Sequence, residues 1–173
     1  MITGRTSRHI KSEYLPVPYF TTIKFYQMKF SSFLLTENRT SHDVGLLLLR
    51  IVAGLVLVYG HGFQKLAVIF TGQEIQFGDP LGIGMTSSFY LVAFAEGICA
   101  LLLIFGLFSR VAALILTFNF LVILWVHLGD EFKILELRFF YLASYMALAL
   151  LGPGRISLDY LLFNPKKKLS ARQ

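Results

Sequence analysis

The sequence predicts an all-α integral membrane protein, a four-helix bundle with both termini in the cytoplasm. Composition is the first reason: 55% of the 173 residues are hydrophobic and only 15% are charged, whereas soluble domains are usually about 45–50% apolar and about 25% charged. The second is that four apolar segments approach the roughly 17–25 residues that a bilayer-spanning helix needs. The third is an uneven distribution of lysine and arginine, which sets the orientation.

The four apolar segments follow one another with defined connections. We expect helices over 44–60 (continuing to about residue 70), 87–105, 111–128 and 134–151. The connecting segments 72–85, 106–110 and 129–133 are punctuated by Gly, Pro and Asp, as is typical of loops. A soluble helical protein would show polar faces at helical spacing, and the third segment has none. This disfavours a soluble fold.

Basic residues gather on one side of the predicted bundle. Twelve of the sixteen Lys and Arg residues precede residue 44, follow residue 151 or lie at Arg110, whereas only Lys65, Lys133 and Arg138 fall on the other side. The positive-inside rule then places both termini in the cytoplasm. This topology accounts for the formal net charge of +6, so a nucleic-acid partner is not needed to explain it.

Three regions are expected along the chain. Residues 1–43 form a cytoplasmic N-terminal segment, 44–160 the membrane domain, and 161–173 a basic cytoplasmic tail. Residues 1–27 lack periodicity, whereas a compact cytoplasmic segment leads into the first helix from Met28. We therefore expect translation to begin at Met28.

Cysteine and histidine limit the possible chemistry. The single cysteine, Cys99, excludes a dithiol exchange by this chain alone. His61 and His127 end the first and third predicted helices on the same side and could approach one another. Two interfacial histidines are more often polar helix ends than ligands, so no metal or haem site is predicted.

Two charges lie deep in the predicted membrane. Glu96 falls near the middle of the second helix and Arg50 within the first, and at about 1.5 Å rise per residue their side chains could meet. An ion pair would relieve both desolvation costs. Two interpretations stay equally open for these two residues: they fasten the bundle, or they line a polar pocket.

Five further polar residues lie nearer the other side of the membrane: His61, Lys65, His127, Glu136 and Arg138. Glu136 and Arg138 are two positions apart on one helix and point in different directions, so each needs a partner on another helix. For this group we favour a pocket that opens outward and admits a small polar headgroup.

Several short motifs occur in a specific order. They are an Arg in the first helix, GHGFQKL from Gly60, Glu96 in the second helix, GLFSR from Gly106, Glu136 at the start of the last helix, and GPGRISLD from Gly152. In the last motif Gly and Pro end the helix, and Arg155 and Asp159 can anchor the chain at the headgroups. Over residues 44–160 the chain resembles the DoxX family of small bacterial membrane proteins.

The resemblance implies a quinone-associated redox component, or a subunit of a membrane oxidoreductase system, in the bacterial cytoplasmic (inner) membrane. The expected site comprises Glu96, Glu136 and His127 as catalytic residues, and Arg50, His61, Lys65 and Arg138 as residues that bind the quinone or polar ligand. Quinone carbonyls need hydrogen-bond donors, and reduction needs a proton path. The sequence has no flavin or nicotinamide fingerprint, so electrons would come from a partner or directly from the substrate.

A second hypothesis is a non-catalytic membrane scaffold that recruits or stabilises a redox partner. Its basic tails would then bind the partner, and the intramembrane charges would be structural. A small-solute transporter is disfavoured because the sequence shows no broken helix pair and no internal repeat. The expected partners are the lipid bilayer and a soluble or membrane redox protein; a homo-oligomer stays open.

The charge distribution predicts opposite compartments for the C-terminus and the first loop. A reporter fused after Gln173 should give a cytoplasmic signal, and one inserted near Asp79 an external signal, because basic flanks are retained inside. The same signal from both fusions would refute the topology.

Overall fold

The computed structural model describes residues 38–163, and within this part the chain is helical with no strand. Four helical spans are long and apolar enough to cross a membrane: Arg39–Thr71, Met85–Phe105, Ser109–Val126 and Phe132–Leu151. The predicted fold class is confirmed, and the chain is a multi-pass membrane protein. The expectations for residues 1–27 and for most of the basic tail lie outside the described residues. The cytoplasmic location of both termini stays a prediction.

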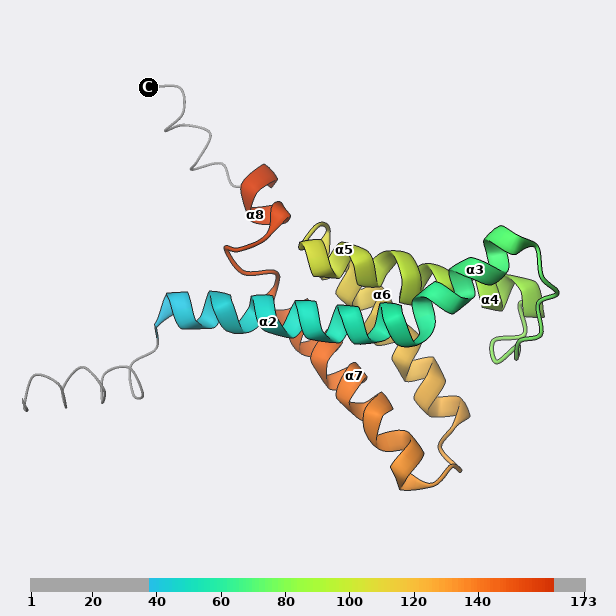
Figure 1. Ribbon diagram of the computed structural model, residues 1–173. Coiled ribbons are helices and arrows are strands. Elements are labelled where there is room, and N and C mark those ends of the chain that lie inside the picture. Colours follow the sequence, from blue (N-terminus) through green and yellow to red (C-terminus); the bar gives the residue numbers. More distant parts are fainter. Residues whose placement is uncertain (1–37, 164–173) are drawn as a thin grey trace, which may run out of the picture. The chain divides into compact units, whose positions relative to one another are not determined.

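Two of the four spans depart from regular α-helix near their middle (Figure 1). The first consists of α2 (Arg39–Leu57), a π-helical segment η1 (Val58–Gly62) and α3 (Phe63–Thr71). The second consists of α4 (Met85–Ala93), a π-helical segment η2 (Phe94–Cys99) and α5 (Ala100–Phe105). The third and fourth are α6 (Ser109–Val126) and α7 (Phe132–Leu151), and a short α8 (Leu158–Phe163) follows.

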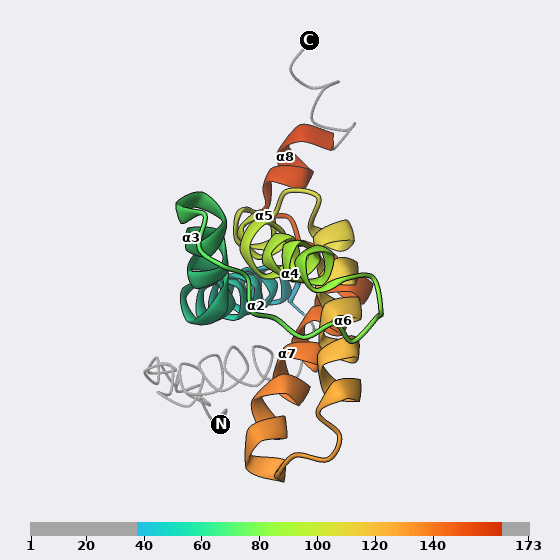
Figure 2. The same cartoon turned by 90° about the vertical axis from the view of Figure 1, so that its right-hand side faces the viewer.

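The spans pack as two crossing pairs. In both views α6 and α7 lie side by side as a hairpin (Figures 1 and 2), while α2 packs on α5 and η1 on η2. Leu57, Ala100 and Leu116 are fully buried between them, and the Tyr145 hydroxyl donates to the Ala53 carbonyl at 2.9 Å. Large apolar side chains on the outside of the spans are exposed, as a lipid-facing surface requires.

The bundle has two chemically different ends. The terminal end carries the turn 106–108 and the segment 152–157, and the pocket end carries the loops 72–84 and 127–131. At the pocket end the α6–α7 hairpin diverges from α3 and α4 in both views (Figures 1 and 2).

Asp159 holds the terminal end together. Its carboxylate accepts the backbone N–H groups of Phe108 at 2.7 Å and Ser109 at 2.8 Å, at the start of α6. A carboxylate is favoured at a helix N-terminus because unpaired N–H groups point toward it. Asp159 therefore anchors α8 to α6, and its expected place at the headgroups stays a prediction. Arg155 lies against Asp43, whose carboxylate accepts its backbone N–H at 2.9 Å.

Replacing Asp159 should destabilise the bundle. Asp159→Ala removes two charge-assisted hydrogen bonds, each worth roughly 1.5–3 kcal/mol, and should clearly lower the unfolding temperature in detergent. Asp130→Ala is the matched control, because it breaks only the exposed Asp130–Arg138 pair at 3.2 Å, and such pairs contribute about 0–1 kcal/mol. Equal shifts for the two variants would contradict this role of Asp159.

Candidate functional site

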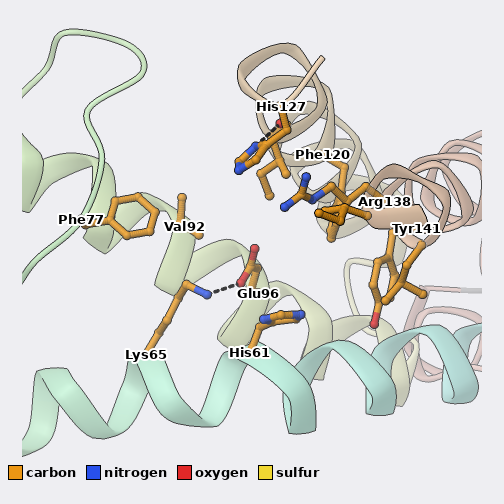
Figure 3. A pocket seen from close by; sticks show the side chains of 12 residues that line it. His61, Lys65, Phe77, Val92, Glu96, Phe120, His127, Arg138 and Tyr141 are labelled. Atoms are coloured by element: carbon orange, nitrogen blue, oxygen red, sulfur yellow. Dashed lines mark hydrogen bonds and ion pairs between the residues drawn. The ribbon is translucent and has the colours of Figure 1, made fainter. Parts of the chain in front are cut away.

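A cavity of about 350 Å³ lies at the pocket end, between the first two spans and the α6–α7 hairpin (Figure 3). Its polar lining comes from all four spans: His61 and Lys65 from the first, Glu96 from the second, and, from the hairpin, His127 at the end of α6 and Arg138 in α7. Its apolar lining includes Val92 and Phe120. The volume lies within the usual range for small-molecule pockets, about 300–1,000 Å³.

The central interaction is an ion pair between Lys65 and Glu96. The Lys65 ammonium donates to one carboxylate oxygen of Glu96 at 2.7 Å, and the Asn119 side-chain amide donates to the other at 3.2 Å. The side chain of Glu96 is only 5% exposed and that of Lys65 17%. A carboxylate at this depth is stable only when its charge is paired and its lone pairs are satisfied, and both conditions are met.

The partner predicted for Glu96 is wrong. Arg50 is completely buried at the terminal end, where its guanidinium donates to the carbonyl of Ile156. By the rise per residue, the side chains of Arg50 and Glu96 could meet. In the structure Arg50 is instead held by the segment that follows α7. This contact favours the interpretation that Arg50 fastens the bundle, by joining the first span to the segment after α7.

The two π-helical segments place the ion pair. His61 lies in η1 and Glu96 in η2, and the two segments are in contact. They approach so closely because of Gly62: a Cβ atom there would lie 2.5 Å from the carbonyl oxygen of Glu96. A π-helical turn rotates the side chains that follow it about the helix axis. Such turns are frequent at functional sites. Here they bring Lys65 and Glu96 to the same crossing.

The histidines and Arg138 complete the polar lining. His127 uses Nδ1 to bond the carbonyl of Ile123 at 2.7 Å, which leaves Nε2 for a ligand (Figure 3). His61 is exposed, and no hydrogen bond of its ring is found among the described residues. Arg138 bonds Asp130 in the loop at 3.2 Å and presents the rest of its guanidinium to the cavity.

An aromatic wall closes one side of the cavity. The ring of Tyr141 packs against that of Phe120 with centroids 4.9 Å apart, and Tyr141 stacks on Tyr145 at 5.9 Å. Tyr141 is 6% exposed and lines the cavity. Its hydroxyl has no partner among the described residues, so it can donate to a ligand.

The structure does not bring all seven predicted site residues together. Glu136 is exposed on the opposite face of α7, beside Phe139 and Phe140, and lines a separate open hollow. Its divergence from Arg138 is as predicted, but its membership of one shared pocket is wrong. Arg50 likewise does not line this cavity. The other five residues line the cavity, and their chemical roles stay predictions.

Sequence reasoning missed Asn119 and Tyr141. Asn119 carried a usable signal, because a strongly polar side chain inside an apolar span is a functional-site hypothesis by default. Tyr141 carried none, since tyrosine is common near membrane interfaces whether or not it binds a ligand.

The loop over residues 72–84 borders the cavity. Phe77 from this loop lines the cavity and packs edge-on against Phe89, with centroids 5.6 Å apart. Asp79 fastens the loop to the start of α4: its carboxylate accepts the Ser88 hydroxyl at 2.8 Å and the Gly84 N–H at 2.8 Å.

These hydrogen bonds make the loop sensitive to acid. The Ser88 hydroxyl, and then the Gly84 N–H, hold the pKa of Asp79 below its ordinary value. A group whose pKa is lowered by folding stabilises the folded form above its unfolded pKa, about 4 for aspartate. That stabilisation is lost as the pH falls through the lowered value, so acidification should release the loop.

Comparisons with known proteins identify the family. The DoxX family model matches residues 45–128, which include His61, Lys65, Glu96, Asn119 and His127. A protein of Bacillus subtilis (strain 168) named "Putative oxidoreductase CatD" is 31% identical over 131 residues, covering 73% of this chain and 93% of its own length. The chain belongs to the DoxX family.

The match to the family model ends before α7, whereas the aligned region of the B. subtilis relative is longer. Tyr141 and Arg138 therefore lie outside the residues that the family model matches. No solved structure matches the chain significantly.

Replacing Glu96 should reveal its true partner. Glu96→Gln leaves Lys65 charged and buried without a counterion, which typically costs about 3–5 kcal/mol, and should lower the unfolding temperature in detergent. Adding Lys65→Gln should recover part of the loss, because both charges are then gone. Adding Arg50→Gln instead should recover nothing. Rescue by Arg50→Gln would contradict the pairing described here.

Removing the Asp79 carboxylate should loosen the loop and little else. In Asp79→Asn, amide hydrogen exchange over residues 72–84 should become faster at neutral pH while the four spans keep their protection. Glu74→Gln, in the same loop but without a hydrogen bond to α4, is the matched control and should exchange like wild type. Unchanged exchange in Asp79→Asn would show that its hydrogen bonds do not hold the loop.

Proposed function

We propose that this DoxX protein binds a quinone in the cavity at the pocket end and acts as a redox component, or as a subunit, of a membrane oxidoreductase system. One observation supports this most: unpaired donors and an aromatic wall meet in one membrane-embedded cavity, beside a balanced Lys65–Glu96 pair. The proposed location is the bacterial cytoplasmic (inner) membrane.

The lining suits a quinone ring. The ring is flat and apolar, and Phe120 and Tyr141 offer a flat apolar wall. Its two carbonyl oxygens accept hydrogen bonds, and the cavity offers the Tyr141 hydroxyl, the Arg138 guanidinium and the N–H groups of Lys65 that Glu96 does not use.

Reduction of a quinone to a quinol takes two electrons and two protons, and the site offers groups that exchange protons. His127 is fixed through Nδ1, so its Nε2 can deliver or accept a proton at the ligand. Lys65 and Glu96 can pass a proton between them without leaving an isolated charge in the membrane. The electrons come from a redox partner or from the reduced substrate, because the sequence contains no fingerprint for a flavin or nicotinamide.

Binding of menadione, a quinone without a tail, tests the proposal. Tyr141→Phe keeps the ring and removes one donor, so it should weaken binding about two- to tenfold, the effect of one hydrogen bond worth about 0.5–1.5 kcal/mol. The affinity can be measured by equilibrium dialysis with protein in lipid nanodiscs. Tyr90→Phe, an exposed tyrosine away from the cavity, is the matched control and should bind like wild type.

Three further results would decide between the hypotheses. Glu136→Gln should leave binding unchanged, because Glu136 lies on the other face of α7. Equal affinity of wild type and Tyr141→Phe would place the quinone elsewhere. Failure of the wild type to bind any quinone, with or without a tail, would refute the proposal, and a stoichiometric partner that purifies with such a protein would favour the scaffold.

A further inference from the structure

A second cavity, with a volume of about 130 Å³, lies beside the first, between α4–η2 and α6, and is bordered by Pro80 and Leu81 of the loop 72–84. Its walls are apolar, with Leu91, Ala95 and Val122 among them. Its two polar lining residues already have protein partners. The Ser88 hydroxyl donates to Asp79 at 2.8 Å, and the Asn119 amide donates to Glu96 at 3.2 Å. What this cavity offers a ligand is therefore mainly hydrocarbon surface.

The second cavity adjoins the proposed quinone site. Val92 lines both cavities. The hydrogen bond from Asn119 to Glu96 joins a residue of the second cavity to a residue of the first. A ligand whose ring lies against Glu96 in the first cavity therefore has the second as its immediate apolar neighbour.

The second cavity also faces the lipid. Leu91 on α4 and Phe118 on α6 line it and are 56% and 60% exposed, and both lie within membrane spans. An apolar cavity of about 150 Å³ is large enough to hold benzene, so this one has room for a short stretch of hydrocarbon. The rest of a longer chain would continue into the bilayer between α4 and α6.

We infer that the second cavity holds the first part of the isoprenoid tail of a membrane quinone whose ring occupies the first cavity. This inference rests on the proposed function and narrows it: the ligand is a lipid-soluble, tailed quinone that reaches the site from the bilayer. A water-soluble quinone would use the first cavity alone and gain nothing from the second.

The test compares menadione with phylloquinone, which has the same ring and an isoprenoid tail, on protein in nanodiscs at a fixed lipid ratio. Val122→Trp fills the second cavity from α6. It should weaken phylloquinone binding about tenfold, the loss expected when roughly two methylene groups are excluded from an apolar site. Menadione binding should stay within about twofold of wild type, since its ring does not enter the second cavity.

Leu121→Trp is the matched control, because Leu121 is the neighbouring residue on α6, is 51% exposed and lines neither cavity. It should bind both quinones like wild type. Val122→Phe adds a smaller ring and provides a second variant should Val122→Trp fail to fold; an intermediate loss for phylloquinone alone would support the inference.

The outcomes separate the two proposals. If menadione binds to wild type but Val122→Trp and Val122→Phe affect phylloquinone no more than Leu121→Trp does, the tail site is wrong and the proposed function stands. If the Val122 variants weaken both quinones equally, the tail site is also wrong. If neither quinone binds to wild type, the proposed function fails and the tail site with it.

Discussion

The charge of Glu96 is the constraint on which the rest of this structure depends. A carboxylate near the middle of a membrane span is costly unless a counterion reaches it, and here the counterion comes from Lys65, on a different span. The ion pair therefore fixes how the first span crosses the second. Asn119 adds a third span to the same carboxylate, so three of the four spans meet at one polar point.

That crossing requires the backbones to lie close together, and the glycines explain how this is possible. Gly62 faces the backbone of Glu96, and Gly97 faces the side chain of Leu66, where an added Cβ would lie 2.9 Å away. Both glycines belong to the π-helical segments. Small residues at helix crossings permit close packing in membranes, and here the close packing lets Lys65 reach a carboxylate on the neighbouring span.

The helical spans were predictable from the sequence, but the polar partners within them were not. Length and hydropathy suffice for a span, because the bilayer sets its minimum length. Pairing depends also on the rotation of each helix about its axis, and one residue turns it by about 100°. The π-helical segments change that rotation at His61 and Glu96, so the depth argument selected Arg50, although Lys65 is the residue that reaches Glu96. Glu136 and Arg138 show the same limit: their spacing predicted different directions, but not which one faces the cavity.

The two ends of the bundle hold polar groups for different reasons. At the terminal end, Asp159 accepts two backbone N–H groups, and Arg50 is completely buried, with one guanidinium nitrogen donating to the carbonyl of Ile156. The other two guanidinium nitrogens of Arg50 have no hydrogen-bond partner among the described residues. At the pocket end, Tyr141, His61 and His127 keep bonding capacity that faces open space. Polar side chains inside a membrane normally pair with one another or face the bundle interior or a cavity. What distinguishes the two ends is access: the polar groups at the pocket end line a cavity of about 350 Å³, whereas Arg50 at the terminal end is fully enclosed by protein. This difference in access favours the pocket end for the proposed ligand.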